Sequence, residues 1–191
     1  MLEKISGKVV DWQVKRGILS QEERSVYRYA YELFLNQTIN VGIAVLIAFL
    51  SGTPVAVALF LLSYIPLRSF CGGYHADTNM GCTIVSALLI IAACFLYIYV
   101  REGSVLRGYP LLFLVSGYCI MRYAPVQDRN KPLDGAERER YGRMSRILWG
   151  IEAAIGILCY AFFPRYGLII AFIHLVMAIV LGLGIWKNAR E

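Results

Sequence analysis

Residues 68–82 read Arg-Ser-Phe-Cys-Gly-Gly-Tyr-His-Ala-Asp-Thr-Asn-Met-Gly-Cys, and apolar runs lie on both sides of this polar stretch. The runs at residues 54–67 and 83–100 have the composition of membrane-spanning segments. The stretch itself gathers one histidine, two cysteines, three glycines and an aspartate. Ionisable groups are expensive within a membrane and are usually functional there. We therefore predict an active site, rather than an interfacial histidine with two filler cysteines.

The composition of the whole chain also indicates a membrane protein. Hydrophobic residues make up 58% of the 191 residues, and the mean hydropathy is +0.57, well above an average soluble domain. The excess lies in long runs, which predicts an all-α integral membrane protein with about six transmembrane helices. The six runs are residues 33–50, 54–67, 83–100, 109–126, 147–163 and 167–186. The second run is short against the roughly 20 residues of a full crossing. We therefore expect a broken or re-entrant segment after it, and a four-span arrangement stays open.

We expect a single membrane domain over residues 1–191, with an N-terminal amphipathic region at 1–32 and the transmembrane region at 33–186. Basic and apolar residues alternate in the first thirty residues, as in short helices that lie on a membrane surface. Ser20 and Glu23 have the spacing of a capping box, which predicts a helix that runs into the first span. No cleavable signal peptide is visible, so we expect the N-terminus to be retained.

The distribution of basic residues predicts the topology. With the N-terminus in the cytoplasm and six alternating spans, 16 of the 19 Lys and Arg residues face the cytoplasm. This is the asymmetry that membrane insertion favours. Both termini and the stretch at 68–82 are then cytoplasmic. We assign the net charge of +6 to topology and to contact with anionic lipid, and expect no nucleic-acid partner.

His75 and Cys82 are the predicted reactive pair, because a histidine can accept the proton of a thiol or stabilise its thiolate. On an unbroken helix their seven-residue spacing is a rise of about 10.5 Å, which exceeds a hydrogen bond of about 3 Å. The pair therefore requires a bend, and we predict a broken helix or loop near residues 76–81. Cys82 would then begin the third span, near the positive end of its helix dipole.

Cys71 is the rival nucleophile, since it lies four residues before His75, one turn away on a continuous helix. Gly72 and Gly73 disfavour such a helix, which favours Cys82 only slightly. Four polar residues are candidates to orient His75, and the sequence does not choose among them: Asp77, Asn79, Gln127 and Asp128. The cysteines and histidine match no common zinc spacing, and we expect no metal and no cofactor. The other histidine, His174, stands alone in the last apolar run and is expected to be a packed polar residue.

Two motifs resemble the accessory gene regulator B family of bacterial membrane proteins. The family carries a Gly-x-His, and a Cys seven residues after that His, at the end of an early membrane span; here these positions are Gly73, His75 and Cys82. Residues 124–133, Ala-Pro-Val-Gln-Asp-Arg-Asn-Lys-Pro-Leu, resemble the family's Ala-Pro segment followed by a basic residue and proline. Chain length, number of spans and basic loops agree as well, so the resemblance covers most of the chain.

This resemblance implies a cysteine endopeptidase of the bacterial cell membrane that matures a quorum-sensing peptide. Its substrate would be an AgrD-like propeptide with an amphipathic leader and an acidic tail. Cys82 would attack the scissile carbonyl and form a thioester, with His75 as general base and then acid. A Cys or Ser of the propeptide would then close a thiolactone or lactone ring. Arg68, Gly73 and Lys131 are the expected contacts with the substrate.

Two other readings stay open. A small transporter or channel could use the glycine-rich stretch as a lining, although it should show repeated halves or polar residues in several spans. A membrane scaffold without chemistry is the third class. The assembly is also open, because a homodimer could help to bury a site in so small a membrane protein.

Overall fold

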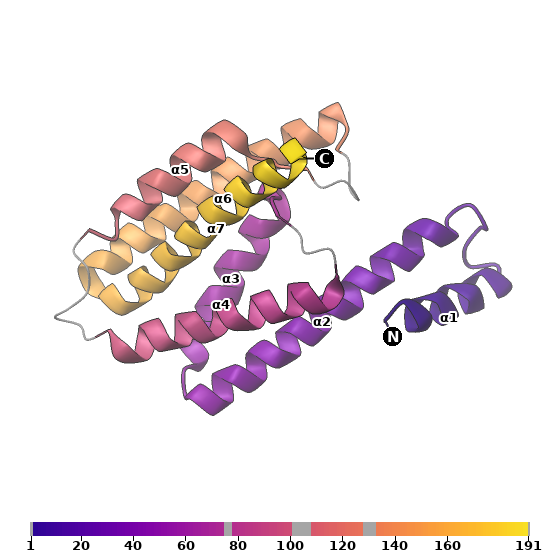
Figure 1. Cartoon of the computed structure of the whole chain (residues 1–191), viewed down its shortest axis with the longest axis horizontal. Coiled ribbons are helices and arrows are strands. Elements are labelled where there is room, and N and C mark those ends of the chain that lie inside the picture. The colour runs from indigo at the N-terminus through magenta and orange to yellow at the C-terminus, as the bar shows by residue number, and fades with distance from the viewer. Residues whose placement is uncertain (1, 75–77, 101–107, 128–132, 191) are drawn as a thin grey trace.

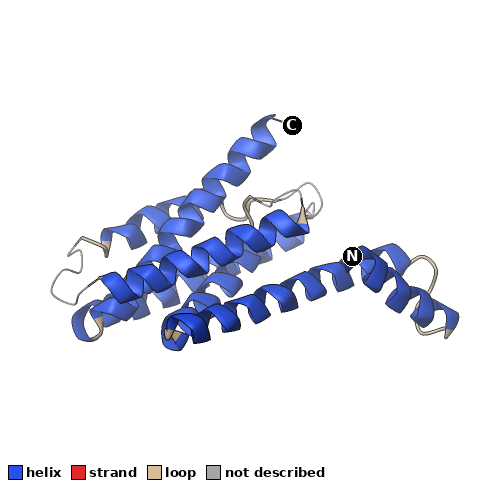
Figure 2. Cartoon of the chain, turned by 60° about the horizontal axis from the view of Figure 1, so that its bottom comes forward, coloured by secondary structure: helices blue, strands red, loops and turns tan. Residues whose placement is uncertain are grey.

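The computed structural model describes residues 2–74, 78–100, 108–127 and 133–190. Within these ranges the chain forms seven helices (Figure 1): α1 (Leu2–Lys15), α2 (Arg24–Ser51), α3 (Pro54–Cys71), α4 (Asn79–Tyr99), α5 (Leu111–Tyr123), α6 (Gly135–Phe162) and α7 (Pro164–Arg190). Figure 2 shows helices and loops, with no strand in the described part of the chain. The prediction of an all-α membrane protein is confirmed, since five of these helices are long and apolar enough to cross a membrane.

Local signals explain several helix ends. Ser20 and Glu23 make the predicted capping-box hydrogen bonds, with the Glu23 N–H donating to Ser20 Oγ at 3.3 Å and the Ser20 N–H donating to Glu23 Oε2 at 3.0 Å, but they close the turn before α2, whose regular helix begins at Arg24. Gly52 ends α2 in the left-handed conformation, φ 66°, where a side chain would be strained. Asp134 and Glu137 form a second capping box at the start of α6.

Three boundaries differ from the sequence prediction. The second span continues to Cys71, so α3 has 18 residues and is not short. The charged residues from 135 to 146 were expected in a loop but form the first turns of α6, because the Asp134 cap starts that helix well before the apolar run. The expected fourth span is represented by α5, which has only 13 helical residues. The count of six spans and a re-entrant segment therefore stay predictions.

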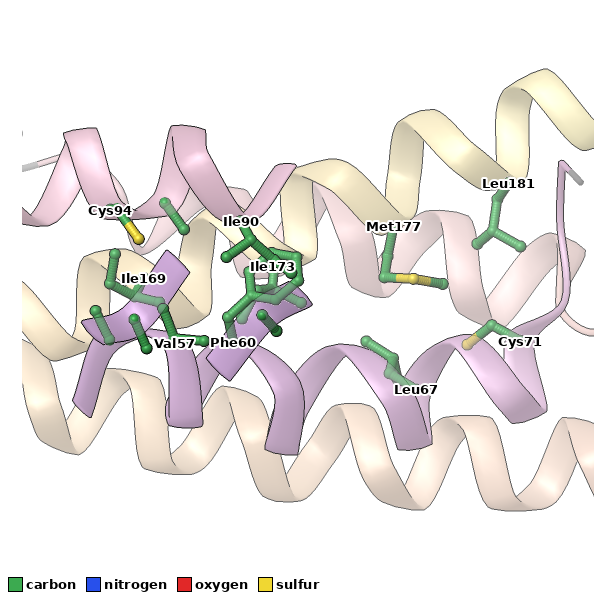
Figure 3. Packing of buried hydrophobic residues seen from close by; sticks show 14 of the residues in the cluster. Val57, Phe60, Leu67, Cys71, Ile90, Cys94, Ile169, Ile173, Met177 and Leu181 are labelled. Carbon is green, nitrogen blue, oxygen red and sulfur yellow. The ribbon is translucent and has the colours of Figure 1, made fainter. Parts of the chain in front are cut away.

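The helices form a packed group with one projecting arm. In Figure 1, α5, α6 and α7 lie side by side, and α3 packs against α7 and α6. Helices α2 and α4 contact each other along the other side of α3, and α1 folds back on the N-terminal part of α2. Figure 3 shows Met177 and Leu181 of α7 facing Leu67 and Cys71 of α3 within the main apolar cluster. The C-terminal end of α3 is therefore fixed against α7.

Candidate functional site

The helix break in the central stretch lies between Cys71 and Asn79. A break was predicted, but near residues 76–81; Asn79 and Gly81 are already helical because Thr78 caps α4 by accepting the Gly81 N–H at 3.0 Å. Cys82 lies in the first turn of α4, and its N–H donates to the Thr78 carbonyl at 3.1 Å. His75 lies outside the described residues.

The two sequence stretches that carry the family resemblance meet in space. The Val126 N–H donates to the Cys71 carbonyl at 2.9 Å, and the Gly73 N–H donates to the Val126 carbonyl at 3.0 Å. These bonds pair Gly72 with Val126 in a parallel, strand-like bridge. Gly72 has φ 68°, and a Cβ there would overlap the Val126 carbonyl oxygen, so only glycine allows the approach. The segment before α6 is thereby attached to the end of α3.

Helix α7 holds the other side of the glycine segment. The Tyr74 N–H donates to the Val180 carbonyl at 2.9 Å, although Val180 lies within the helix. A Cβ on Gly184 would come within 2.7 Å of Gly73 Cα, so the two backbones are in direct contact. Further along, Lys187 Nζ lies 5.4 Å from the centre of the Tyr74 ring, a cation–π contact. Tyr74 directly precedes His75 in the chain.

The end of α7 also reaches the second motif, because Asn188 Nδ2 donates to the Gln127 carbonyl at 2.9 Å. One helix end therefore contacts both motifs. Of the Gly182-Leu183-Gly184 sequence, only Gly184 makes such a contact, since a Cβ on Gly182 would meet open space.

Arg68 is positioned by the same segment. Its guanidinium donates to the carbonyls of Gly73 and Tyr74, the two residues before His75. Tyr64, one turn earlier on α3, lines the same cavity as Arg68, and the sequence gave no reason to select it. Lys131, the other basic residue expected to contact substrate, lies outside the described residues.

A cavity of about 440 Å³ lies beside these residues. It is bounded by α2, α3, the first turns of α4 and the segment before α6, and Arg68, Gly72 and Gly73 are part of its wall. Helix α4 contributes Asn79 and Ser86, which flank Cys82 at helical spacing on the same face. Of the residues considered for orienting His75, Asn79 and Gln127 line the cavity, while Asp77 and Asp128 are not described.

The two candidate thiols differ in accessibility. Cys71 is fully buried, with no exposed surface, whereas Cys82 is partly exposed. A nucleophile must reach its substrate, so burial disfavours Cys71 in this conformation. Among the described residues, no three His, Cys, Asp or Glu side chains gather closely enough to hold a metal ion.

His174 is buried as expected, but it is not alone. Its Nδ1 lies 2.8 Å from Ser116 Oγ of α5, and its Nε2 lies 3.4 Å from Glu152 Oε2 of α6. All three side chains are buried, so a polar cluster joins the three C-terminal helices. The sequence had indicated that polar residues gather in the central stretch. This cluster shows that they also lie within the C-terminal helices. The missed signal was Glu152, a carboxylate within the apolar run at 147–163.

The fold and the hydrogen-bonded Gly72-Gly73 segment define a class of protein. It is a multi-pass helical membrane protein with a partly exposed cysteine on a helix that lines a cavity. The model of the family Accessory gene regulator B matches residues 3–186, and the chain belongs to this family. Membership points to a role in the processing of an autoinducer peptide.

Relatives are similar at low identity. A protein of Clostridium perfringens (strain SM101) named as AgrB-like is 24% identical over 146 residues, covering 73% of this chain and 68% of the relative. An AgrB-like protein of Listeria innocua is 25% identical over 132 residues, covering 69% and 64%. One of Clostridium acetobutylicum is 26% identical over 121 residues, covering 62% and 56%. No solved structure matches the chain.

Proposed function

We propose that this protein is a membrane cysteine endopeptidase that removes the C-terminal tail of a short AgrD-like propeptide. The observation that carries the proposal is the meeting of two motifs distant in sequence. The Gly72-Gly73 segment is hydrogen-bonded to Val126 beside a cavity whose wall includes Asn79 and Ser86, the helical neighbours of Cys82 on α4.

In the first step, Cys82 Sγ forms a bond to the carbonyl carbon of the scissile peptide. His75 takes the thiol proton and returns it to the leaving amine as the C–N bond breaks. The acyl part stays on Cys82 as a thioester, and the tail leaves. The position of Cys82 supports this role, because it is partly exposed in the first turn of α4, where a substrate can reach it.

In the second step, a Cys or Ser side chain of the propeptide attacks the thioester carbonyl. The new thioester or ester closes the ring, and Cys82 recovers its thiol. Exchange of one thioester for another is nearly balanced, so removal of the tail draws the reaction forward. Arg68, Gly73 and Lys131 are the proposed substrate contacts, with the two basic residues serving the tail's carboxylates. Because Arg68 is already bonded to two carbonyls, it also orders the segment before His75.

We place the site and both termini on the cytoplasmic side, on the distribution of Lys and Arg. Single cysteines introduced at Ser104 and Ala136 test this orientation. A membrane-impermeant thiol reagent added outside cells should label the first and not the second. The reverse pattern would overturn the orientation.

Cleavage is tested by co-expressing the protein with a propeptide that has an internal Cys and an acidic tail, followed by mass spectrometry of the products. Cys82→Ala and His75→Ala should each abolish tail release, while Cys71→Ala should leave most of it. Substantial cleavage by Cys82→Ala would overturn the proposal. If the wild-type protein exports the peptide without cutting it, the transporter alternative is correct instead.

A further inference from the structure

We infer that the cavity holds the acyl half of the substrate, with the apolar residues that precede the scissile bond in its closed end and the leaving tail at its mouth. This inference rests on the proposed function and adds the direction and the chemical class of the bound segment. It follows from where Cys82 lies along the cavity and from how the lining changes with depth.

Three helices give the cavity its depth. Residues from Tyr29 to Val41 of α2 line it, as do residues from Phe60 to Phe70 of α3 and from Asn79 to Ile90 of α4. Each stretch spans eleven to thirteen residues, which is about 16–20 Å at 1.5 Å per residue. The cavity is therefore a channel that follows the helices, deep enough for several residues of extended peptide at about 3.3 Å each.

The lining changes from mixed to apolar along this depth. At the mouth, where α3 ends and α4 begins, polar wall residues (Arg68, Ser69, Thr78, Asn79 and Gln127) lie among glycines and apolar or aromatic ones (Phe70, Gly72, Gly73, Pro125, Val126, Leu133 and Tyr141). The closed end consists mainly of Val41, Phe60, Leu61 and Ile90. Phe60 and Ile90 are almost fully buried, at 1% and 2% exposure, so this end is sealed by apolar side chains. A charged tail placed there would be desolvated without an ionic partner in the wall.

Cys82 is not itself part of the cavity wall, but it lies on α4 between two wall residues, three positions after Asn79 and four before Ser86. A carbonyl placed at its sulfur therefore has the mouth on one side and the apolar end on the other. After cleavage the tail has to leave while the acyl group stays bound as the thioester. Only the mouth lets the tail leave, because the other end is closed. The acyl half must accordingly lie in the apolar end.

Amide side chains between the two ends suit a peptide backbone. Gln37 and Asn40 lie one turn apart on the α2 wall, and Ser86 faces the cavity from α4. Asn40 Oδ1 is buried and has no hydrogen-bond partner among the described residues. Burying a polar atom without a partner is unfavourable. The N–H of a bound peptide is a suitable donor to this oxygen.

The inference is tested with the purified full-length protein in lipid nanodiscs and synthetic propeptides that differ only at the residue before the scissile bond. The wild-type protein should cleave a peptide with leucine at this place at least roughly tenfold more efficiently than one with aspartate. Equal efficiency for the two peptides would overturn the inference.

Leu61→Trp fills the closed end, and Leu62→Trp is its matched control, since Leu62 is 72% exposed on the other face of α3. Leu61→Trp should raise KM for the leucine peptide roughly tenfold. The control should leave KM unchanged, and iodoacetamide should alkylate Cys82 at similar rates in both variants. Ile90→Ala, which enlarges the same end, should shift preference towards a larger residue such as tryptophan.

If Leu61→Trp behaves like Leu62→Trp while cleavage still requires Cys82, the inference fails and the proposed function stands. A changed set of co-purifying lipids with an unchanged KM would assign the closed end to a lipid chain and also overturn the inference. If the wild-type protein cleaves no peptide at all, the proposed function fails and the inference falls with it.

Discussion

Helices α7 and α4 differ in how much of each is buried within the chain. About 56% of the apolar part of α7 is buried, against 17% for α4. Helix α7 supplies the contacts that hold the glycine segment, and α4 supplies Cys82. The two parts of the proposed site, the glycine segment and Cys82, are therefore held by different helices. The segment before His75 is fixed to the packed group of helices, while the thiol lies on a helix with much of its surface exposed.

This difference predicts which substitutions should affect both the fold and the site, and which should affect cleavage alone. Changes in α7 or its partners should affect both the fold and the site, because the same helix packs the core and contacts Gly73. Changes at the start of α4 should affect cleavage while the rest of the chain stays folded.

Removing Glu152 should destabilise the protein most. Glu152→Ala removes the carboxylate that lies 3.4 Å from His174 Nε2, and leaving a buried polar group without a partner costs about 3 kcal/mol. The free energy of unfolding in mixed micelles measures this. The control is Glu139→Ala on the same helix, whose pair with Arg143 is mostly exposed and should contribute less than about 1 kcal/mol. Similar losses in the two variants would show that the buried cluster does not join the helices.

Gly184→Ala should damage the site through the α7 contact. The added Cβ meets the backbone of Gly73 at 2.7 Å, so the two segments must separate. We expect kcat for tail release to fall roughly thirtyfold, which corresponds to about 2 kcal/mol of overpacking. Gly182→Ala, two residues away, places its Cβ in open space and should stay within about twofold of wild type. Equal rates in both variants would exclude α7 as the support of this segment.

Thr78→Ala should loosen the start of α4. Losing the cap to the Gly81 N–H should cost about 1 kcal/mol of helix stability and reduce cleavage about fivefold. Thr78→Ser keeps the hydroxyl and should restore most activity. The unfolding free energy of the whole protein should change far less than in Glu152→Ala. A loss of cleavage that serine does not restore would assign Thr78 another role.

The smallest effect is expected at the start of α2, far from both supports. Hydrogen bonds from the Ser20 backbone and hydroxyl hold the pKa of Glu23 below its ordinary 4.5. The charged form is therefore favoured in the folded state, and its contribution is complete above pH 4.5 and is lost as the pH falls through the lower folded pKa. Hydrogen exchange at residues 21–27 should show weaker protection in Glu23→Gln than in wild type at pH 7. This difference should shrink as the pH falls below 4.5; a constant difference would contradict the assignment.

The membrane fold could be predicted from the sequence because long apolar runs have few alternatives. The capping box at Ser20 and Glu23 was also readable, since it depends on residues three positions apart. The start of α6 was missed because charged residues suggested a loop, although Asp134 and Glu137 carry the same capping pattern. The prediction of the helix break was off by several residues, because Asn79 and Gly81 suit a bend as well as a first helical turn.

The site was predicted only where its residues are neighbours in sequence. The stretch at 68–82 was identified by its composition, and the second motif by resemblance. Their pairing through Gly72 and Val126 depends on contacts between residues more than fifty positions apart, which a single sequence does not reveal. The position of Tyr64 in the cavity wall and the contact of Gly184 with Gly73 were missed for the same reason, because a tyrosine or a glycine in an apolar run has no distinctive local pattern.

The central claim is that Cys82 forms the acyl-enzyme, and trapping that intermediate tests it most directly. The purified protein in nanodiscs is mixed with a propeptide whose internal Cys is replaced by alanine, so that the ring cannot close. After an acid quench, peptide mapping by mass spectrometry locates the bound acyl group. We predict one hydroxylamine-sensitive adduct, on Cys82, with a mass equal to the propeptide without its tail. An adduct on Cys71, or tail release without any adduct on Cys82, would contradict the account.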